Sequence, residues 1–244
     1  MAGISPAGAI IFTPMATMYE TIMDLPLFKG VGKDHVSSFL EKTNISFINY
    51  APDDIIVKPG DSSSMLRYVI SGSVCIAYQN RLDGLMVTSV GGKGTLIGAE
   101  RLFGIHTRSY GAVRALDDVS IMAFSKEQYV NLLNTDSIYQ INFYNYLSLR
   151  CQRRISAQLE YSHDTLIGRL AIIVSSLTEA EASAITVELP VKELQQLTHD
   201  GDGREINALV KDRIISVDGT KFRINDRFRL LDEAARNKYA SSRR

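Results

Sequence analysis

The sequence predicts an α+β protein in which a domain of short strands precedes a long helix and a smaller, mainly helical module. Three observations support this. Runs rich in β-branched and aromatic residues recur roughly every ten residues between positions 45 and 124. The segment of residues 136–161 contains neither glycine nor proline. Near the C-terminus, two helical patterns are followed by Asp218-Gly219, a strong hairpin signal.

The strand region alternates apolar runs with turn residues. The runs are ISFINY, MLRYVISG, SVCIAYQN, LMVTSV, GAVRAL and VSIMAF, and the turns include KPGDSSS, SGS, RLDG and VGGKG. This pattern is typical of an all-β sandwich or a barrel-like roll. Before it, Val36, Phe39 and Leu40 have the spacing of a short amphipathic helix. After it, Ser125 is placed as a helix N-cap.

Residues 136–161 would span about 39 Å as one helix. A seam of residues at three- and four-residue steps runs along it, with apolar ends and a polar middle. Such a seam either packs along the strand domain or pairs with its own copy in a dimer. Its members are Ile138, Ile141, Asn145, Ser148, Gln152, Ile155 and Leu159.

The C-terminal region has the pattern of a winged helix-turn-helix. The segment ITVEL is typical of a strand, VKELQQLTHDGDGREINALVKD of a helix, a turn and a second helix, and RIISV-DG-TKFRI of a hairpin. The second helix lies between Gly203 and Ile214, which leaves it about ten residues. A preceding helix has an apolar stripe of Leu166, Leu170, Ile173 and Leu177.

The formal net charge is zero, but the charges are unevenly distributed. Residues 204–244 contain eleven Lys and Arg against six Asp and Glu. A basic end on a slightly acidic body indicates a nucleic acid or another anionic partner, although a solvated basic tail has the same composition.

Several classes of protein are disfavoured. Cys75 and Cys151 form no CxxC, which argues against a disulfide scaffold, structural zinc and an iron–sulfur cluster, and predicts a cytoplasmic location. The four histidines share no metal-ligand spacing. We expect no secretory leader, because the N-terminus has no basic region and its apolar run Ala9–Phe12 is short, and no membrane span, because no stretch approaches 18 apolar residues. Without GxSxG, HExxH or a P-loop, we do not expect an enzyme.

The order of these elements resembles the cyclic-AMP receptor/fumarate–nitrate regulator (CRP/FNR) superfamily of bacterial transcription factors over roughly residues 25–230. Five segments carry the resemblance: LPLFKGV, KPGDSSSMLRYVISGSVCIAY, LIGAERLFG followed by RS, NYLSLRCQRRI, and IGRLAIIV. The resemblance implies a jelly-roll-like, cyclic nucleotide-binding-like sensor, a homodimer formed through the long helix, and binding to promoter DNA and RNA polymerase. The expected parts are an N-terminal extension (1–20), a β-roll sensor (21–134), a dimerisation helix (135–162) and a winged helix-turn-helix domain (163–244).

The resemblance also implies a ligand site in the roll. Arg108 and Ser109 match the family's phosphate-binding pair, and Gly98 matches the glycine that opens the phosphate-binding loop. Ala99 stands where the family has its ribose-binding glutamate, and Glu100 lies one residue further on. The residues of the long helix nearest to the expected base are Gln152, Arg153 and Arg154.

Half of the phosphate-binding cassette is therefore present, and three alternatives stay open. The roll binds a cyclic nucleotide, it binds another small anion, or it binds no ligand and Arg108 forms a salt bridge with Glu100. The effector is left unidentified.

The second helix of the helix-turn-helix is some four to six residues shorter than the family pattern. Ile206, Leu209 and Val210 are expected to form its buried face, while Asp200 and Asp202 would repel phosphate. Either the module still binds DNA, or it has lost specific binding and the chain is a small-molecule-binding module. The candidate DNA contacts are Arg204 and Asn207 to bases, and Lys192, Lys211, Lys221 and Arg223 to phosphates.

Overall fold

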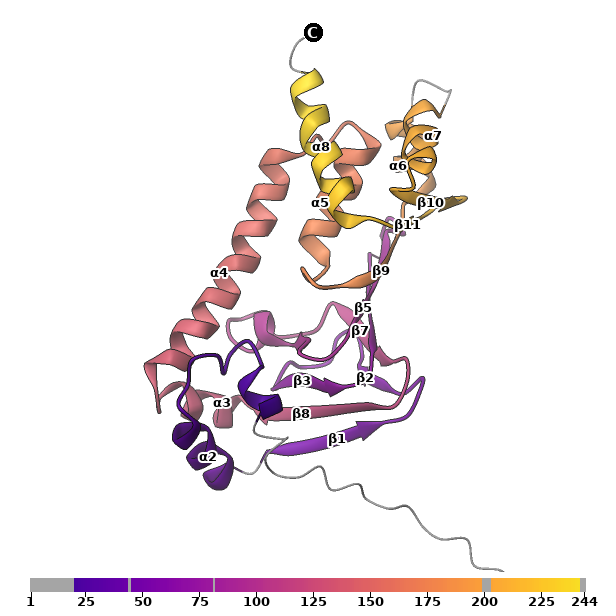
Figure 1. Cartoon of the computed structure of the whole chain (residues 1–244). Helices are drawn as coiled ribbons and strands as arrows, with labels where there is room; N and C mark the ends of the chain where they lie inside the picture. Colours follow the sequence, from indigo (N-terminus) through magenta and orange to yellow (C-terminus); the bar gives the residue numbers. More distant parts are fainter. Residues whose placement is uncertain (1–19, 44, 81, 199–202, 242–244) are drawn as a thin grey trace, which may run out of the picture.

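The computed structural model describes residues 20–43, 45–80, 82–198 and 203–241, so the extension expected at residues 1–20 lies almost entirely outside them. The predicted α+β architecture is confirmed, with an antiparallel β domain, a long helix and a C-terminal helical module (Figure 1). The strands are β1 (Ser46–Tyr50), β2 (Ile55–Val57), β3 (Met65–Ser71), β4 (Val74–Gln79), β5 (Met86–Gly91), β6 (Leu96–Ile97), β7 (Gly111–Ala115), β8 (Val119–Ser125), β9 (Ser183–Glu188), β10 (Ile215–Asp218) and β11 (Lys221–Ile224). The helices are α2 (Lys33–Lys42), the 3-10 turn η1 (Ala99–Arg101), α3 (Lys126–Leu133), α4 (Ser137–Glu160), α5 (Leu166–Leu177), α6 (Val191–Leu197), α7 (Arg204–Lys211) and α8 (Arg227–Ser241).

The β domain consists of two antiparallel layers. One is the sheet β1-β8-β3-β6, and the other contains β2, β7, β4 and β5. Val69 and Ile121 from the first layer and Val74 and Val113 from the second are buried in one apolar cluster between them. All six runs predicted as strands are strands. The short strands β2 and β6 were not predicted, because two or three residues are too few to show an alternation.

The second layer does not end at the boundary of the roll. Strand β9 from the C-terminal region pairs antiparallel with β5, and the hairpin strands follow in the sheet order β10-β11-β9-β5-β4-β7-β2. Val87 lies opposite Val187 in this register, and both belong to the buried core of the C-terminal module. One continuous sheet therefore joins the roll to the helix-turn-helix.

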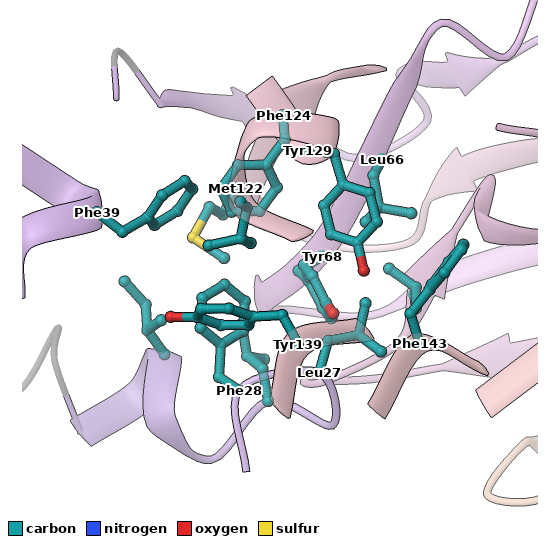
Figure 2. Close-up of a cluster of buried hydrophobic side chains, with 14 of the residues drawn as sticks. Leu27, Phe28, Phe39, Leu66, Tyr68, Met122, Phe124, Tyr129, Tyr139 and Phe143 are labelled. Carbon is teal, nitrogen blue, oxygen red and sulfur yellow. The ribbon is translucent and has the colours of Figure 1, made fainter. Parts of the chain in front are cut away.

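An aromatic cluster fixes the first half of α4 to the roll (Figure 2). The ring of Phe28 meets Tyr139 of α4 edge-on, with centroids 5.5 Å apart, and Tyr129 of α3 meets Phe143 at 5.3 Å. Ser125 caps α3 through its hydroxyl, as the sequence predicted. The beginning of α4 is thus held in place, and its later turns extend towards α5 (Figure 1).

The predicted seam of α4 lies mainly on the exposed side of the helix. Only Ile138 packs against the core of the roll. Ile141, Ile155 and Leu159 have 55%, 55% and 69% of their surface exposed. The seam therefore does not pack along the roll beyond its first residue. None of the helices in the described ranges combines the length and apolarity needed to cross a membrane.

Candidate ligand pocket and nucleic-acid interface

The loop after β6 forms one wall of a pocket in the roll. It turns at Gly98, whose φ of 92° lies in the left-handed region that favours glycine. A Cβ atom at this position would lie 2.9 Å from the Oγ atom of Ser63 and 3.0 Å from the carbonyl oxygen of Met65. The Ser63 hydroxyl donates to the Gly98 carbonyl at 3.2 Å, which fixes the turn against the neighbouring loop.

The pocket encloses about 60 Å³, which is room for a few water molecules and too little for a nucleotide. Its wall is formed mainly by the roll, with one contribution from beyond α5. The ionisable acids and guanidinium groups in the wall are Asp61, Arg67, Glu100, Arg101 and Glu179.

Three of the four candidate ligand residues line this pocket, namely Gly98, Glu100 and Ser109. The fourth, Arg108, is outside the wall; its side chain is exposed and donates to the carbonyl of Gly60 at 3.0 Å. The Ser109 hydroxyl donates to the carbonyl of Gly111 at 2.8 Å. A pocket therefore forms at the loop predicted from the sequence, but Arg108 is not part of its wall.

Two other arginines provide the positive charge of the wall. The guanidinium of Arg101 stacks 3.4 Å from the ring centroid of Tyr110 and donates to the carbonyl of His106. Arg67 lies on β3, where burial lowers its pKa, and its Nε atom is buried without a hydrogen-bond partner. The sequence signal for Arg67 is a charge within the apolar run MLRYV.

A buried arginine on α4 stands behind the two carboxylates of the wall. Arg150 is 9% exposed and forms ion pairs with Glu100, at 3.5 Å, and with Glu179. Glu100 thus pairs with Arg150, and Arg108 donates to the carbonyl of Gly60 instead of forming the salt bridge with Glu100 that was one of the three alternatives. The Tyr146 hydroxyl accepts a hydrogen bond from Arg150 at 3.1 Å.

The three α4 residues expected near a base lie elsewhere. Arg153 donates to the carbonyls of Ser175 and Thr178, and Arg154 donates to the carbonyl of Ser176. These carbonyls lie at the C-terminal end of α5, where helical acceptors lack partners within the helix. Arg153 and Arg154 therefore tie α4 to α5. Gln152 is exposed to solvent.

Tyr78 of β4 completes the wall on the side of Glu100. Burial raises the pKa of Tyr78, and the nearby Glu100 carboxylate raises it further. The phenol is therefore neutral at physiological pH and can donate a hydrogen bond. Together the wall offers guanidinium groups, a phenol and hydroxyls to an anion, and carboxylates to a donor.

In the C-terminal module, the second helix of the helix-turn-helix is short, as predicted. Helix α7 has eight residues, and Leu209 forms its buried contact with Ile206 packed alongside. The prediction for Val210 was wrong, because this side chain is 42% exposed. Glu205 points inward, where its carboxylate accepts the backbone N–H of Ile167 at 3.0 Å. Asp200 and Asp202 lie outside the described residues.

Two of the candidate phosphate contacts, Lys221 and Arg223, lie on the second strand of the hairpin after α7. Its two-residue loop is Gly219-Thr220, one position later than Asp218-Gly219, and Gly219 has a φ of 58°. This order puts glycine at the first central position of the turn. Lys221 lies 3.8 Å from Glu188. All six candidate DNA-contacting side chains are exposed: Lys192, Arg204, Asn207, Lys211, Lys221 and Arg223.

The sequence predicted no metal site, and the arrangement of possible ligand side chains bears on this prediction. Among the described residues, no group of three or more His, Cys, Asp and Glu side chains is arranged to hold a metal ion. Cys75 is half-buried and Cys151 is exposed, each as a free thiol.

Comparisons with known proteins agree with this architecture. The profile of the cyclic nucleotide-binding domain matches residues 47–136. The crystal structure of Thermus thermophilus catabolite activator protein is similar with 20% sequence identity and a TM-score of 0.50, and the match covers 87% of this chain and 99% of that chain.

The sensor domain of the transcriptional regulator DNR from Pseudomonas aeruginosa is similar with 17% identity and a TM-score of 0.50, over 58% of this chain and 93% of that one. A search of curated protein sequences finds no significant match. Residues 47–136 therefore match the cyclic nucleotide-binding domain family, and the chain has the fold of the Thermus thermophilus catabolite activator protein.

Proposed function

We propose that this protein is a CRP/FNR-like transcriptional regulator, a cytoplasmic homodimer that binds promoter DNA under the control of a signal received in the roll. The observation that carries the proposal is the pocket of the roll, whose wall includes Glu179 from beyond α5. A ligand in this pocket would contact the same segment that connects to the helix-turn-helix. RNA polymerase is the natural partner of such a regulator, and no catalytic role is proposed.

Dimerisation is supported by the exposed seam of α4. Ile141, Ile155 and Leu159 present apolar surface to solvent along a helix of 24 residues. Isolated exposed apolar residues are common, but a row at helical spacing is typical of an interface between helices. Two copies would place two winged modules for two half-sites on DNA.

DNA binding is supported by the outward faces of α7 and of the hairpin. Arg204 and Asn207 lie on exposed positions of the first turn of α7, where base edges are contacted in a helix-turn-helix. Lys221 and Arg223 lie on the exposed face of β11, in the wing. Cations at such positions neutralise phosphates and supply most of the sequence-independent affinity.

Selection of binding sequences from random duplexes, followed by gel shift, tests the proposal. We expect one enriched motif with two-fold symmetry, bound at about 150 mM salt, where random DNA is released. The double variant Lys221→Ala/Arg223→Ala should bind both the enriched motif and random DNA more weakly, because it removes wing charges without changing the core. Absence of any enriched sequence would contradict the proposal.

A second function is favoured by the length of α7. Eight residues span about 12 Å, which limits the number of bases within reach. The alternative is a small-molecule-binding module whose helix-turn-helix no longer reads sequence. It predicts ligand affinity together with DNA binding that is equal for all sequences and lost at moderate salt.

A further inference from the structure

The ion pair between Arg150 and Glu179 joins two parts of the chain. Arg150 belongs to α4, which is anchored to the roll, and Glu179 follows the end of α5 in the C-terminal module. The side chains are 10% and 22% exposed, so solvent screens the pair only weakly. Glu179 also lines the pocket, so its carboxylate belongs both to the pocket wall and to the contact between the two parts.

The backbone of Glu179 is tied to the C-terminal module. Its carbonyl accepts a hydrogen bond from Arg227 of α8, and the same guanidinium donates to the hydroxyl of Thr178. Helix α8 packs on α5. A displacement of the Glu179 carboxylate from Arg150 is therefore transmitted to the module through these contacts.

The charges around the pocket are balanced only while Glu179 is in place. Three carboxylates, of Asp61, Glu100 and Glu179, face three guanidinium groups, of Arg67 and Arg101 in the wall and Arg150 behind it. Withdrawal of Glu179 leaves one uncompensated positive charge at a buried position, which is costly. A ligand with one negative charge restores the balance.

The size of the pocket supports the same conclusion. About 60 Å³ accommodates a few water molecules, so a larger ligand enters only if part of the wall moves. Glu179 is the wall residue that comes from beyond α5, whereas the other wall residues belong to the roll. Its movement enlarges the pocket and exposes Arg150 in one step.

We propose that the Glu179 carboxylate is an internal occupant of the ligand site, and that a small, singly charged anion replaces it on Arg150 and thereby releases the C-terminal module from the roll. The inference rests on the proposed function for its biological meaning, but the competition itself does not require DNA. Because ligand and Glu179 exclude each other, binding and release are linked, and each shifts the other by the same factor.

The test uses the full chain and two matched variants. Glu179→Gln removes the competing charge while keeping the size of the side chain, and Glu181→Gln removes a charge two residues away whose side chain is exposed. The probe is dimethyl phosphate, a singly charged phosphodiester, and the control probe is the uncharged trimethyl phosphate. Titration calorimetry measures affinity, and circular dichroism verifies that each variant is folded.

We expect Glu179→Gln to bind dimethyl phosphate at least tenfold more tightly than the wild type and Glu181→Gln to match the wild type. Trimethyl phosphate should not distinguish the three proteins. Equal affinities for the wild type and Glu179→Gln, or no binding by either, would overturn the proposal.

Hydrogen–deuterium exchange measures the release independently. Amides of residues 175–182 and of β9 should exchange faster in Glu179→Gln without a probe, and in the wild type when dimethyl phosphate is saturating. Unchanged exchange in both cases would show that Glu179 is only a structural contact. A gel shift with the selected DNA separates the two proposals, because failure to bind any DNA contradicts the regulator function and leaves the calorimetric result standing.

Discussion

The carboxylate of Glu205, in the second helix of the helix-turn-helix, accepts a hydrogen bond from the backbone N–H of Ile167 at 3.0 Å. Ile167 lies in the first turn of α5, where backbone N–H groups have no partner within the helix. Glu205 thus connects α7 to α5. Its contribution is structural, and Arg204, Asn207 and Lys211 are the exposed polar residues of α7.

Glu205→Ala should therefore lower the free energy of unfolding by about 1 kcal/mol, which is typical for the loss of a capping interaction. Urea denaturation at neutral pH measures this. Lys211→Ala, on the exposed end of the same helix, is the control and should leave stability nearly unchanged. If the Glu205 variant is as stable as the wild type but changes which base pairs are preferred, the side chain reads DNA after all.

The exposed seam of α4 predicts the oligomeric state. Ile155→Glu should convert a dimer to a monomer, because it puts a charge into the apolar interface that two α4 helices would share. Sedimentation velocity measures the change. Phe228→Glu is the matched control, since Phe228 is 83% exposed on α8 and lies outside the seam. A wild-type protein that sediments as a monomer at high concentration would contradict the proposed interface.

The candidate DNA contacts are base contacts and phosphate contacts, and their substitution should change DNA binding in different ways. Asn207→Ala should weaken binding to the selected sequence by about 1–3 kcal/mol and leave random DNA unaffected, as expected for a base contact. Arg223→Ala should weaken both equally and reduce the slope of log affinity against log salt by about 1. Fluorescence anisotropy at several salt concentrations separates them. An equal loss on both DNAs for Asn207→Ala would exclude its role in base reading.

The N-terminus of α4 is predicted to be sensitive to acid. The pKa of Asp136 is lowered by the backbone N–H of Ile138 and by His35, whose Nδ1 lies 2.8 Å from the carboxylate. Because the folded pKa is below the unfolded value of about 3.9, the stabilisation is fully present above that pH and is lost as the pH falls through the folded pKa.

The variant Asp136→Asn tests this dependence. The difference in unfolding free energy between the wild type and Asp136→Asn should be present at about pH 5 and shrink below about pH 4. Thermal unfolding across this range provides the measurement. A difference that persists unchanged at the lowest pH would mean that the carboxylate charge is not responsible.

Substitution of Gly98, at the turn in the pocket wall, should destabilise the protein. Gly98→Ala should cost about 1–2 kcal/mol through its left-handed backbone, and more because the added Cβ meets Ser63 and Met65. Gly104→Ala is the control, because Gly104 has a similar φ of 87° but no atom within 4 Å of the added Cβ. Equal destabilisation of the two variants would show that the contacts around Gly98 are easily relieved.

The sequence predicted local structure well and long-range contacts poorly. The strand runs, the Ser125 cap and the short α7 follow from patterns within a few residues, and each is present. The position of Arg108 depends on which way a loop side chain turns, and a motif match does not determine that. The Arg150–Glu179 pair joins positions far apart in the chain, and no local pattern indicates that these two side chains meet.

The sheet that passes from β5 to β9 has a consequence for any attempt to study the halves of this protein separately. A cut between α4 and α5 would remove the pairing between β5 and β9. The backbone N–H and C=O groups that each strand directs at the other would then be exposed. Each strand would keep its other neighbour but become an exposed sheet edge, and such edges pair readily with other chains, which leads to aggregation. The side chain of Val87, which lies in the core of the C-terminal module, would also become exposed. Soluble fragments of this chain would therefore need a replacement strand or charged substitutions along the new edge.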